Sequence, residues 1–320
     1  MRTTGPCWQG IENVPERLEV EQVNLEQFFA SIKGKTVTFC GVGRSHMPVI
    51  QMFCEQGMPV SVRDKRPLEE LGENGEILKK WGVSLLLGED YLQNLSEDII
   101  FRTPGMSYHL PELEAARARG AAVTSEMEVF FKLCPCKIYA VTGSDGKTTT
   151  TSILAALLEA QGKTVHLGGN IGKPLLPEIA SIRPEDCAVV ELSSFQLISM
   201  RESPDVAVVT NLSPNHLDVH KDMQEYIDAK KNILLHQDAF SRTVLNAGNE
   251  ITASFAPDVR GDCWLFRRGE AVERGVWCDE EALYVQGKKL MPLSQIRIPG
   301  WHNVENYMAA ILAVSRYVPV

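Results

Sequence analysis

The most chemically distinctive stretch of the sequence is a glycine-bearing loop that ends in lysine and threonine. Residues 142–148 read TGSDGKT, between an apolar run at 138–141 and a helical pattern at 147–161. In this context the glycines let backbone N–H groups point at phosphate oxygens, Lys147 supplies a charge for the terminal phosphates, and the Thr148 hydroxyl can bind Mg²⁺. The residues expected to contact ATP are Gly143, Ser144, Asp145, Gly146, Lys147, Thr148 and Thr149.

The loop departs from the commonest spacing at one position. The standard motif has glycine where this chain has Val141. That difference points away from motor proteins and GTPases and toward the variant TGxxGK followed by serine or threonine. The alternative is a plain glycine-rich turn that caps a helix, which the lysine and hydroxyl directly after Gly146 disfavour.

Two polar residues at or after predicted strands could serve the same site. Glu191 ends an apolar strand at 188–191, where a carboxylate can hold Mg²⁺ beside Thr148 or merely cap a turn. His216 follows a strand at 206–210 and could ligate a metal, touch phosphate or be a polar surface group. Both positions are at the carboxyl ends of strands, where an open parallel sheet collects its ligands.

Four further residues are weak candidates when taken alone and become stronger ones beside the phosphate loop. Lys230 lies on a predicted helix at 223–236 and, taken alone, would be a solvated lysine. Asn170 sits in the turn sequence GNIG, which could present its amide to a ligand or be an ordinary turn. Asn303 and Asn306 share one face of the last predicted helix; one asparagine would be expected as a cap, and two suggest recognition of a base.

The N-terminal part has the layout of a nucleotide-binding crevice. Two glycines follow the predicted strand at 36–40, and Asp64 ends the next strand about 20 residues on. His46 takes the place of the third glycine of a dinucleotide fingerprint, which disfavours NAD and a Rossmann oxidoreductase. The residues expected to meet a nucleoside and its diphosphate are Gly43, Arg44, Ser45, Asp64, Lys65 and Arg66.

The alternation of short apolar runs with helical patterns predicts an α/β protein with two parallel-sheet domains. We expect a Rossmann-like domain at 1–133 and a P-loop ATPase-like domain at 134–320, with an antiparallel edge within 261–298. Predicted strands are 36–40, 60–63, 83–87, 98–102, 122–124, 138–141, 188–191 and 206–210. Predicted helices are 48–56, 68–81, 111–119, 147–161, 223–236 and 303–316.

Composition excludes several classes of function. The chain has 32 basic and 41 acidic residues, a formal net charge of -9, which argues against a nucleic-acid or anionic-membrane partner. Residues 1–21 contain no apolar run, so no signal peptide or membrane span is expected and the cytoplasm is the default location. Cys134 and Cys136 are close-spaced, but no second pair at finger spacing supports a zinc site.

The motifs TGSDGKTT, GGNIG, ELSSFQ, NLSPNHLD, AKxxI and GxHNxxN together resemble those of the murein peptide ligases, over nearly the whole chain from about residue 36. Within that family, ELSSFQ and the short diphosphate loop look like the branch that adds D-glutamate to UDP-N-acetylmuramoyl-L-alanine in peptidoglycan precursor synthesis. The resemblance implies that ATP phosphorylates the alanyl carboxylate and that the amine of D-glutamate attacks the resulting acyl phosphate.

The resemblance also implies roles for residues. Two Mg²⁺ ions are expected, one bound by Thr148 and Glu191 and one bound by His216 and a carbamylated Lys230. The catalytic residues would be Lys147, Glu191, His216 and Lys230. Other implied contacts are Asn306 with adenine, Asn170 and Ser193 with the muramoyl substrate, and the N-terminal domain with UDP.

Two rival interpretations remain. Folylpolyglutamate synthases and the other murein ligases share the loop and the carbamylated lysine but differ in the N-terminal domain and acceptor. A partner-binding protein that keeps ATP without turnover is disfavoured because the four catalytic residues are intact. A monomer is expected.

The family continues into a third domain, which this chain is expected to lack after Val320. We therefore expect it to bind the UDP-linked substrate without completing the ligation. Residues 1–35 have no assigned role.

Overall fold

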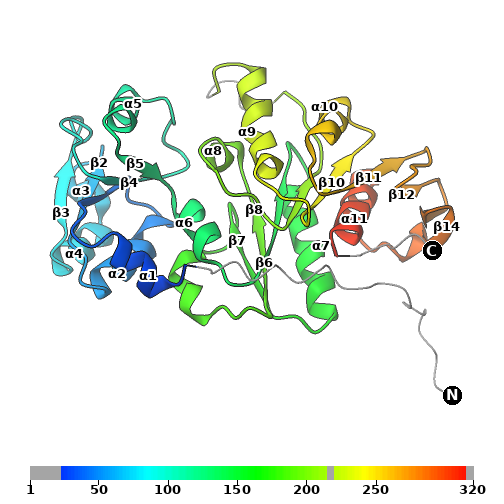
Figure 1. Ribbon diagram of the computed structural model, residues 1–320, viewed down its shortest axis with the longest axis horizontal. Helices are drawn as coiled ribbons and strands as arrows, with labels where there is room; N and C mark the ends of the chain where they lie inside the picture. Colours follow the sequence, from blue (N-terminus) through cyan, green and yellow to red (C-terminus); the bar gives the residue numbers. More distant parts are fainter. Residues whose placement is uncertain (1–22, 215–219, 315–320) are drawn as a thin grey trace.

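The first part of the chain forms a five-stranded parallel sheet, at the left of Figure 1. The structure is a computed structural model that describes residues 23–214 and 220–314. The strand order is β3-β2-β1-β4-β5. The strands are β1 (Val37–Cys40), β2 (Val60–Asp64), β3 (Ser84–Leu87), β4 (Ile99–Arg102) and β5 (Ala122–Thr124). Strand order reverses beside β1, so the loops after β1 and β4 border the crevice where such sheets bind ligands.

The helices of this part confirm the predicted alternation with one correction. They are α1 (Leu25–Ser31), α2 (His46–Glu55), α3 (Leu68–Leu71), α4 (Glu73–Lys80) and α5 (Pro111–Ala118). The single helix predicted at 68–81 is wrong, because Gly72 adopts φ 55° and ψ -133° and divides it into α3 and α4. A side chain at that left-handed φ would be strained, whereas glycine adopts it freely.

A second sheet of nine strands fills the right of Figure 1. Its order is β14-β13-β12-β11-β10-β9-β6-β8-β7. Its strands are β6 (Lys137–Thr142), β7 (Val165–Gly169), β8 (Cys187–Glu191), β9 (Val206–Val209), β10 (Arg242–Asn246), β11 (Asp262–Arg268), β12 (Gly275–Cys278), β13 (Ala282–Val285) and β14 (Lys288–Pro292). The predicted antiparallel edge is confirmed for β12 to β14, but β11 pairs in parallel with both neighbours, so that edge is shorter than expected.

Helices cover both faces of the nine-stranded sheet. The helices are α7 (Lys147–Ala160), α8 (Ser194–Leu197), α9 (Met223–Leu235), α10 (Glu250–Ala253) and α11 (Trp301–Val314), with 3₁₀ turns η1 (Leu176–Ser181), η2 (Ala256–Asp258) and η3 (Leu293–Gln295). Side chains alternate along the central strand: Tyr139 and Val141 pack with α7 and α11, whereas Ile138 and Ala140 pack with α9 and η1. This alternation follows from the two-residue period of a strand.

Helix α6 (Glu126–Leu133) lies between the two sheets (Figure 1). The change from one sheet to the other falls between Thr124 and Lys137. One apolar cluster nevertheless runs from Phe39 through Phe130 of α6 to Ile138. Because this core is continuous, the division at 133/134 into separate domains stays a prediction. Within 23–214 and 220–314, no helix is long and apolar enough to cross a membrane.

Phe53 of α2 is the centre of an aromatic cluster in the N-terminal sheet. Its ring is fully buried and lies 5.1 Å from Phe29 of α1, and 5.4 Å from both Phe39 of β1 and Phe101 of β4. Edge-to-face pairs at these distances add to the free energy of burial. This one side chain therefore joins two helices to two strands.

We expect Phe53→Ala to lower the free energy of unfolding by about 3–5 kcal/mol, because it leaves a cavity among these rings. Urea unfolding measures the change. Phe53→Leu is the matched control and should lose less. A loss below about 1 kcal/mol in the alanine variant would show that the cluster is not a packing centre.

Candidate functional site

The glycine-bearing loop joins β6 to α7, the strand-loop-helix context that a phosphate site requires. Gly146 caps α7 in the left-handed conformation, with φ 77°. The ammonium of Lys147 folds over the loop and donates to the carbonyls of Gly143 and Ser144, at 3.0 and 2.9 Å. The lysine charge is therefore held at the helix N-terminus, where the backbone N–H groups also favour an anion.

The segment after β9 braces this loop from behind. The Ser144 N–H donates to the Asn211 carbonyl at 2.8 Å, and the Thr210 hydroxyl donates to the Asp145 carbonyl at 2.6 Å. A Cβ at Gly143 would lie 1.9 Å from the Thr210 hydroxyl oxygen, and Gly143 has φ 153°. The close approach of the two segments therefore requires glycine at position 143.

Glu191, at the end of β8, joins the phosphate loop to a second loop. Its buried carboxylate accepts a hydrogen bond from the Thr148 hydroxyl at 2.6 Å and one from the Asn170 amide at 2.8 Å. Octahedral Mg²⁺ with ligands at 2.0–2.1 Å places adjacent oxygens roughly 3 Å apart. The Thr148 and Glu191 oxygens are thus close to the spacing of two ligands of one Mg²⁺ ion.

Lys230 lies beneath the phosphate loop, although its sequence context alone would make it a solvated lysine. Its side chain is 2% exposed and donates to the Gly143 carbonyl at 2.9 Å and to the Thr142 hydroxyl at 3.3 Å. Burial, and then the charge of Lys147, lower the Lys230 pKa to about 7 against an opposing effect of Glu191. A large share of this amine is therefore uncharged at neutral pH. His216 lies outside the described residues.

Asn306, on α11, also reaches the phosphate loop. Its buried side chain accepts from the Thr150 hydroxyl at 3.1 Å and donates to Asn303 at 3.2 Å. A Cβ at Gly146 would lie 2.3 Å from the Asn306 carbonyl oxygen. Asn306 therefore packs against the glycine that caps α7, while its contact with adenine stays a prediction.

In the N-terminal sheet, Asp64 and Arg66 hold the turn after β1. The Asp64 carboxylate accepts from the Val42 N–H at 2.6 Å and from the Arg66 guanidinium at 2.8 Å, and Arg66 donates to the Val42 carbonyl at 2.6 Å. Burial raises the Asp64 pKa, but the hydrogen bonds from Arg66 and Val42 outweigh it and hold the pKa below its usual value. Both side chains thus brace the turn; their contact with a nucleoside stays a prediction.

A cavity of about 320 Å³ brings residues from the two sheets together. Arg44 and Ser45, at the start of α2, and Asn170 all line it, while their contact with a substrate stays a prediction. Its lining residues are Arg44, Ser45, His46, Arg102, Pro104, Ser125, Glu126, Met127, Gly169, Asn170, Gly172, Lys173, Pro174 and Gln196. The predicted substrate contacts outside this lining are Gly43, Asp64, Lys65, Arg66 and Ser193. Ser193 instead caps α8, in a capping box with Gln196.

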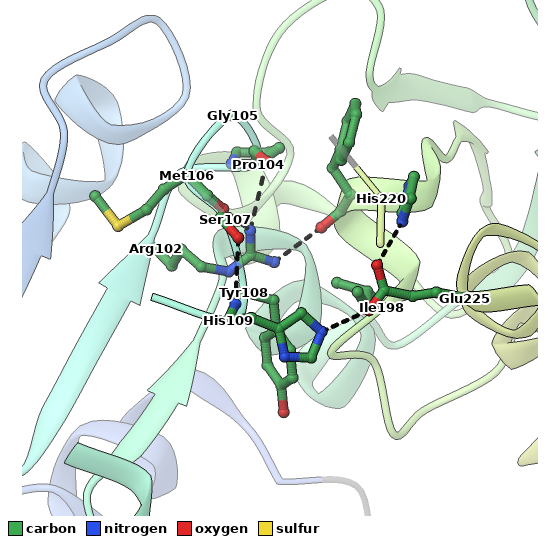
Figure 2. A pocket seen from close by; sticks show the side chains of 11 residues that line it. Arg102, Pro104, Gly105, Met106, Ser107, Tyr108, His109, Ile198, His220 and Glu225 are labelled. Atoms are coloured by element: carbon green, nitrogen blue, oxygen red, sulfur yellow. Dashed lines mark hydrogen bonds and ion pairs between the residues drawn. The ribbon is translucent and has the colours of Figure 1, made fainter. Parts of the chain in front are cut away.

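A second cavity, of about 230 Å³, lies where the loop after β4 meets α8 and α9 (Figure 2). The buried Arg102 guanidinium donates to the Met106 carbonyl at 2.6 Å and to the Phe195 carbonyl at 2.8 Å. Beside it, His109 lies 2.8 Å from a carboxylate oxygen of Glu225 on α9. These contacts tie the loop after β4 to α8, which follows Glu191 along the chain, and to α9, which carries Lys230.

The sequence patterns did not single out four charged residues that line the cavities: Arg102, Glu126, Lys173 and Glu225. Arg102 ends an apolar strand, and a charge at that position could have drawn attention to it. Glu126 begins α6, where an acidic residue is expected on helix-dipole grounds alone. Its sequence context therefore carried no distinguishing feature.

The amino-acid sequence of this chain is similar to a known protein family and to several named relatives. Residues 141–314 match the Mur ligase middle domain. The UDP-N-acetylmuramoylalanine–D-glutamate ligase of Acetivibrio thermocellus is 49% identical over 295 residues, which cover 91% of this chain and 63% of that protein. The protein of the same name from Clostridium kluyveri is 47% identical, with coverage of 91% and 64%. The chain thus spans less than two thirds of the length of these relatives.

Solved structures support the fold. The UDP-N-acetylmuramate:L-alanyl-gamma-D-glutamyl-meso-diaminopimelate ligase of Neisseria meningitidis superposes with a TM-score of 0.59, at 19% identity, covering 87% of this chain and 92% of that one. The UDP-N-acetylmuramate-alanine ligase of Thermotoga maritima superposes with a TM-score of 0.50, at 21% identity, covering 87% of this chain and 64% of that one. These similarities show that the α/β architecture is shared.

The packing at Gly143 gives a direct test of the loop. We expect Gly143→Ala to cost about 1–3 kcal/mol of stability, because the methyl group collides with Thr210. It should also weaken binding of an ATP analogue at least about tenfold. Gly162→Ala is the control, since Gly162 has φ 80° but open space around its Cβ position. Equal nucleotide affinity in the two variants, measured by calorimetry, would contradict the proposed role of the loop.

Proposed function

The chain belongs to the Mur ligase family, and on that premise we propose that the protein is an ATP-dependent ligase that joins D-glutamate to UDP-N-acetylmuramoyl-L-alanine. The observation that carries the proposal is the bridge made by Glu191. Its carboxylate contacts Thr148 of the phosphate loop and Asn170 of the substrate-cavity loop. Nucleotide and acceptor carboxylate would therefore meet at one point. The name shared by relatives at 45–49% identity supports D-glutamate as the amine.

The reaction would proceed by phosphoryl transfer and then amide formation. The substrate's alanyl carboxylate attacks the γ-phosphorus of ATP, ADP leaves, and an acyl phosphate forms. The amine of D-glutamate then attacks the acyl carbon, and phosphate leaves with its bonding electrons while the amine loses a proton. Negative charge concentrates on phosphate oxygens in the first step, and Lys147 together with the loop N–H groups stabilises it there.

Mg²⁺ would supply further charge neutralisation on the phosphate oxygens. The first ion would be held by Thr148 and Glu191, whose oxygens lie 2.6 Å apart. We assign the second ion to His216 and to Lys230 in a carbamylated form. The uncharged form of this buried amine can attack CO₂: the N–C bond forms, one amine proton is released, and the resulting carbamate offers oxygen ligands.

The UDP-linked substrate would occupy the cavity of about 320 Å³. Its diphosphate is assigned to the start of α2, where Arg44 and Ser45 line the cavity and the Arg44 guanidinium can meet the phosphate charge. Asn170 would meet the muramoyl part, and Asp64, Lys65 and Arg66 the uridine. The monomeric state and the cytoplasmic location expected from the sequence stay predictions.

Substrate identity can be tested by calorimetric titration. We expect UDP-N-acetylmuramoyl-L-alanine to bind at least about tenfold more tightly than UDP-N-acetylmuramate, because the alanyl residue adds an amide and a methyl group that can contact the cavity and extends the carboxylate toward Lys147; tenfold corresponds to about 1.4 kcal/mol. Folate should not bind. Preferential binding of folate, or equal binding of the two UDP-linked compounds, would refute the substrate assignment.

The carbamate on Lys230 can be observed directly. In ¹³C-bicarbonate, we expect a carbamate resonance that Lys230→Ala abolishes and that the neighbouring Lys231→Ala retains. The resonance should weaken as pH falls from about 8 to 6, because the Lys230 pKa of about 7 means that the amine gains a proton over this range. A wild-type protein without the resonance at pH 8 would contradict the assignment.

A further inference from the structure

Glu126 is a buried carboxyl group in the substrate cavity that the proposed reaction does not use. It is the first residue of α6, is 7% exposed and contributes to the lining of the cavity of about 320 Å³. Carboxylates are rarely buried to this degree unless paired with a cation or used in function. Its position therefore requires an explanation.

Glu126 holds one end of the loop that carries Asn170. The Leu176 N–H donates to the Glu126 carboxylate at 2.9 Å, and the Leu175 N–H also bonds to it. At the other end, the Asn170 N–H donates to the Glu191 carbonyl at 2.8 Å. Two glutamates thus fix the two ends of loop 170–176, one in the substrate cavity and one at the phosphate loop.

The charge on Glu126 is poorly compensated. Burial raises its pKa to about 7, and the two backbone N–H groups oppose the shift only in part. The other charged or titratable groups along the cavity are Arg44, His46, Arg102 and Lys173. Three of these have partners elsewhere: Arg102 donates to backbone carbonyls, the His46 ring contacts the Gly41 carbonyl at 2.8 Å, and Lys173 pairs with Glu178. The neighbouring helix carboxylate, Glu128, accepts from Ser199.

We propose that Glu126 is a proton-linked positioning residue: when the diphosphate-bearing substrate enters the cavity, Glu126 takes up one proton from solvent and becomes a neutral acid. The inference rests on the proposed function, which places an anionic ligand in this cavity. A nearby anion and the loss of water both disfavour a second negative charge there. The neutral acid keeps an oxygen for the Leu176 N–H and gains an O–H that can donate into the cavity.

The stability of Glu126→Gln at two pH values distinguishes this proposal from a purely structural role of Glu126. Because folding raises the Glu126 pKa, its contribution to stability is full below the unfolded value and is lost as pH rises through about 7. Glu126→Gln should therefore raise the thermal midpoint at pH 8 and change it little at pH 5. An anchor that needs the carboxylate would instead be destabilised at pH 8, and failure of the variant to fold would likewise overturn the proposal.

The decisive measurement is calorimetry of UDP-N-acetylmuramoyl-L-alanine binding at pH 7.5 in buffers of different ionisation enthalpy. We expect the wild-type chain to take up on the order of half a proton per ligand and Glu126→Gln to take up almost none. Glu128→Gln, a buried carboxylate on the same helix but outside the cavity lining, should retain the uptake.

The outcomes distinguish failure of the role proposed for Glu126 from failure of the proposed function. Binding without proton uptake overturns the role of Glu126 and leaves the proposed function intact. Uptake that persists in Glu126→Gln also overturns it and points to His46, whose pKa burial lowers to about 4. Absence of binding by the wild-type chain refutes the proposed function and this inference with it.

Discussion

The carboxylate of Glu191 is the interaction on which the arrangement of the site depends. It ends β8 with one oxygen on the Thr148 hydroxyl and the other on the Asn170 amide. β8 lies between β6 and β7, and these strands lead into the phosphate loop and the Asn170 loop. A single buried acidic group therefore sets the spacing between the two loops. Strand order in the parallel sheet makes this contact possible, because neighbouring strands end at one edge.

The electrostatics of the site follow from placing two lysines at one loop. Lys147 lies over the loop and Lys230 beneath it, and both donate to the Gly143 carbonyl. Two ammonium groups so close, one of them buried, cannot both remain charged without a large cost. Burial, and then the charge of Lys147, accordingly lower the Lys230 pKa. Occupation of the loop by phosphate would relieve that cost for Lys147, while conversion to a carbamate would remove it for Lys230.

The sequence predicted those features that are determined locally. The phosphate loop was identifiable because its glycines, Lys147 and Thr148 are consecutive and flanked by a strand and a helix. All five strands of the N-terminal sheet were predicted for the same reason: their apolar runs are short and bounded by turns. β7 was missed, since His166 and two glycines interrupt its apolar pattern.

The remaining features depend on tertiary contacts that no local pattern reports. Lys230 is on an ordinary-looking helix, and only the packing of α9 under β6 makes it buried. In the sequence, Glu126 resembles any acidic residue at the start of a helix. Its hydrogen bond from the Leu176 N–H depends on how the fold positions loop 170–176. Asn306 was singled out for base recognition, yet its close packing on Gly146 depends on α11 lying against α7.

The central claim is that Glu191 and Thr148 hold Mg²⁺ at the phosphate loop. Its most direct test is the affinity of the wild-type chain and of Glu191→Gln for a non-hydrolysable ATP analogue, each titrated with and without Mg²⁺. The account predicts that Mg²⁺ tightens binding at least about tenfold in the wild type and has little effect in Glu191→Gln, because the variant lacks the anionic ligand. An equal gain from Mg²⁺ in both proteins would contradict it.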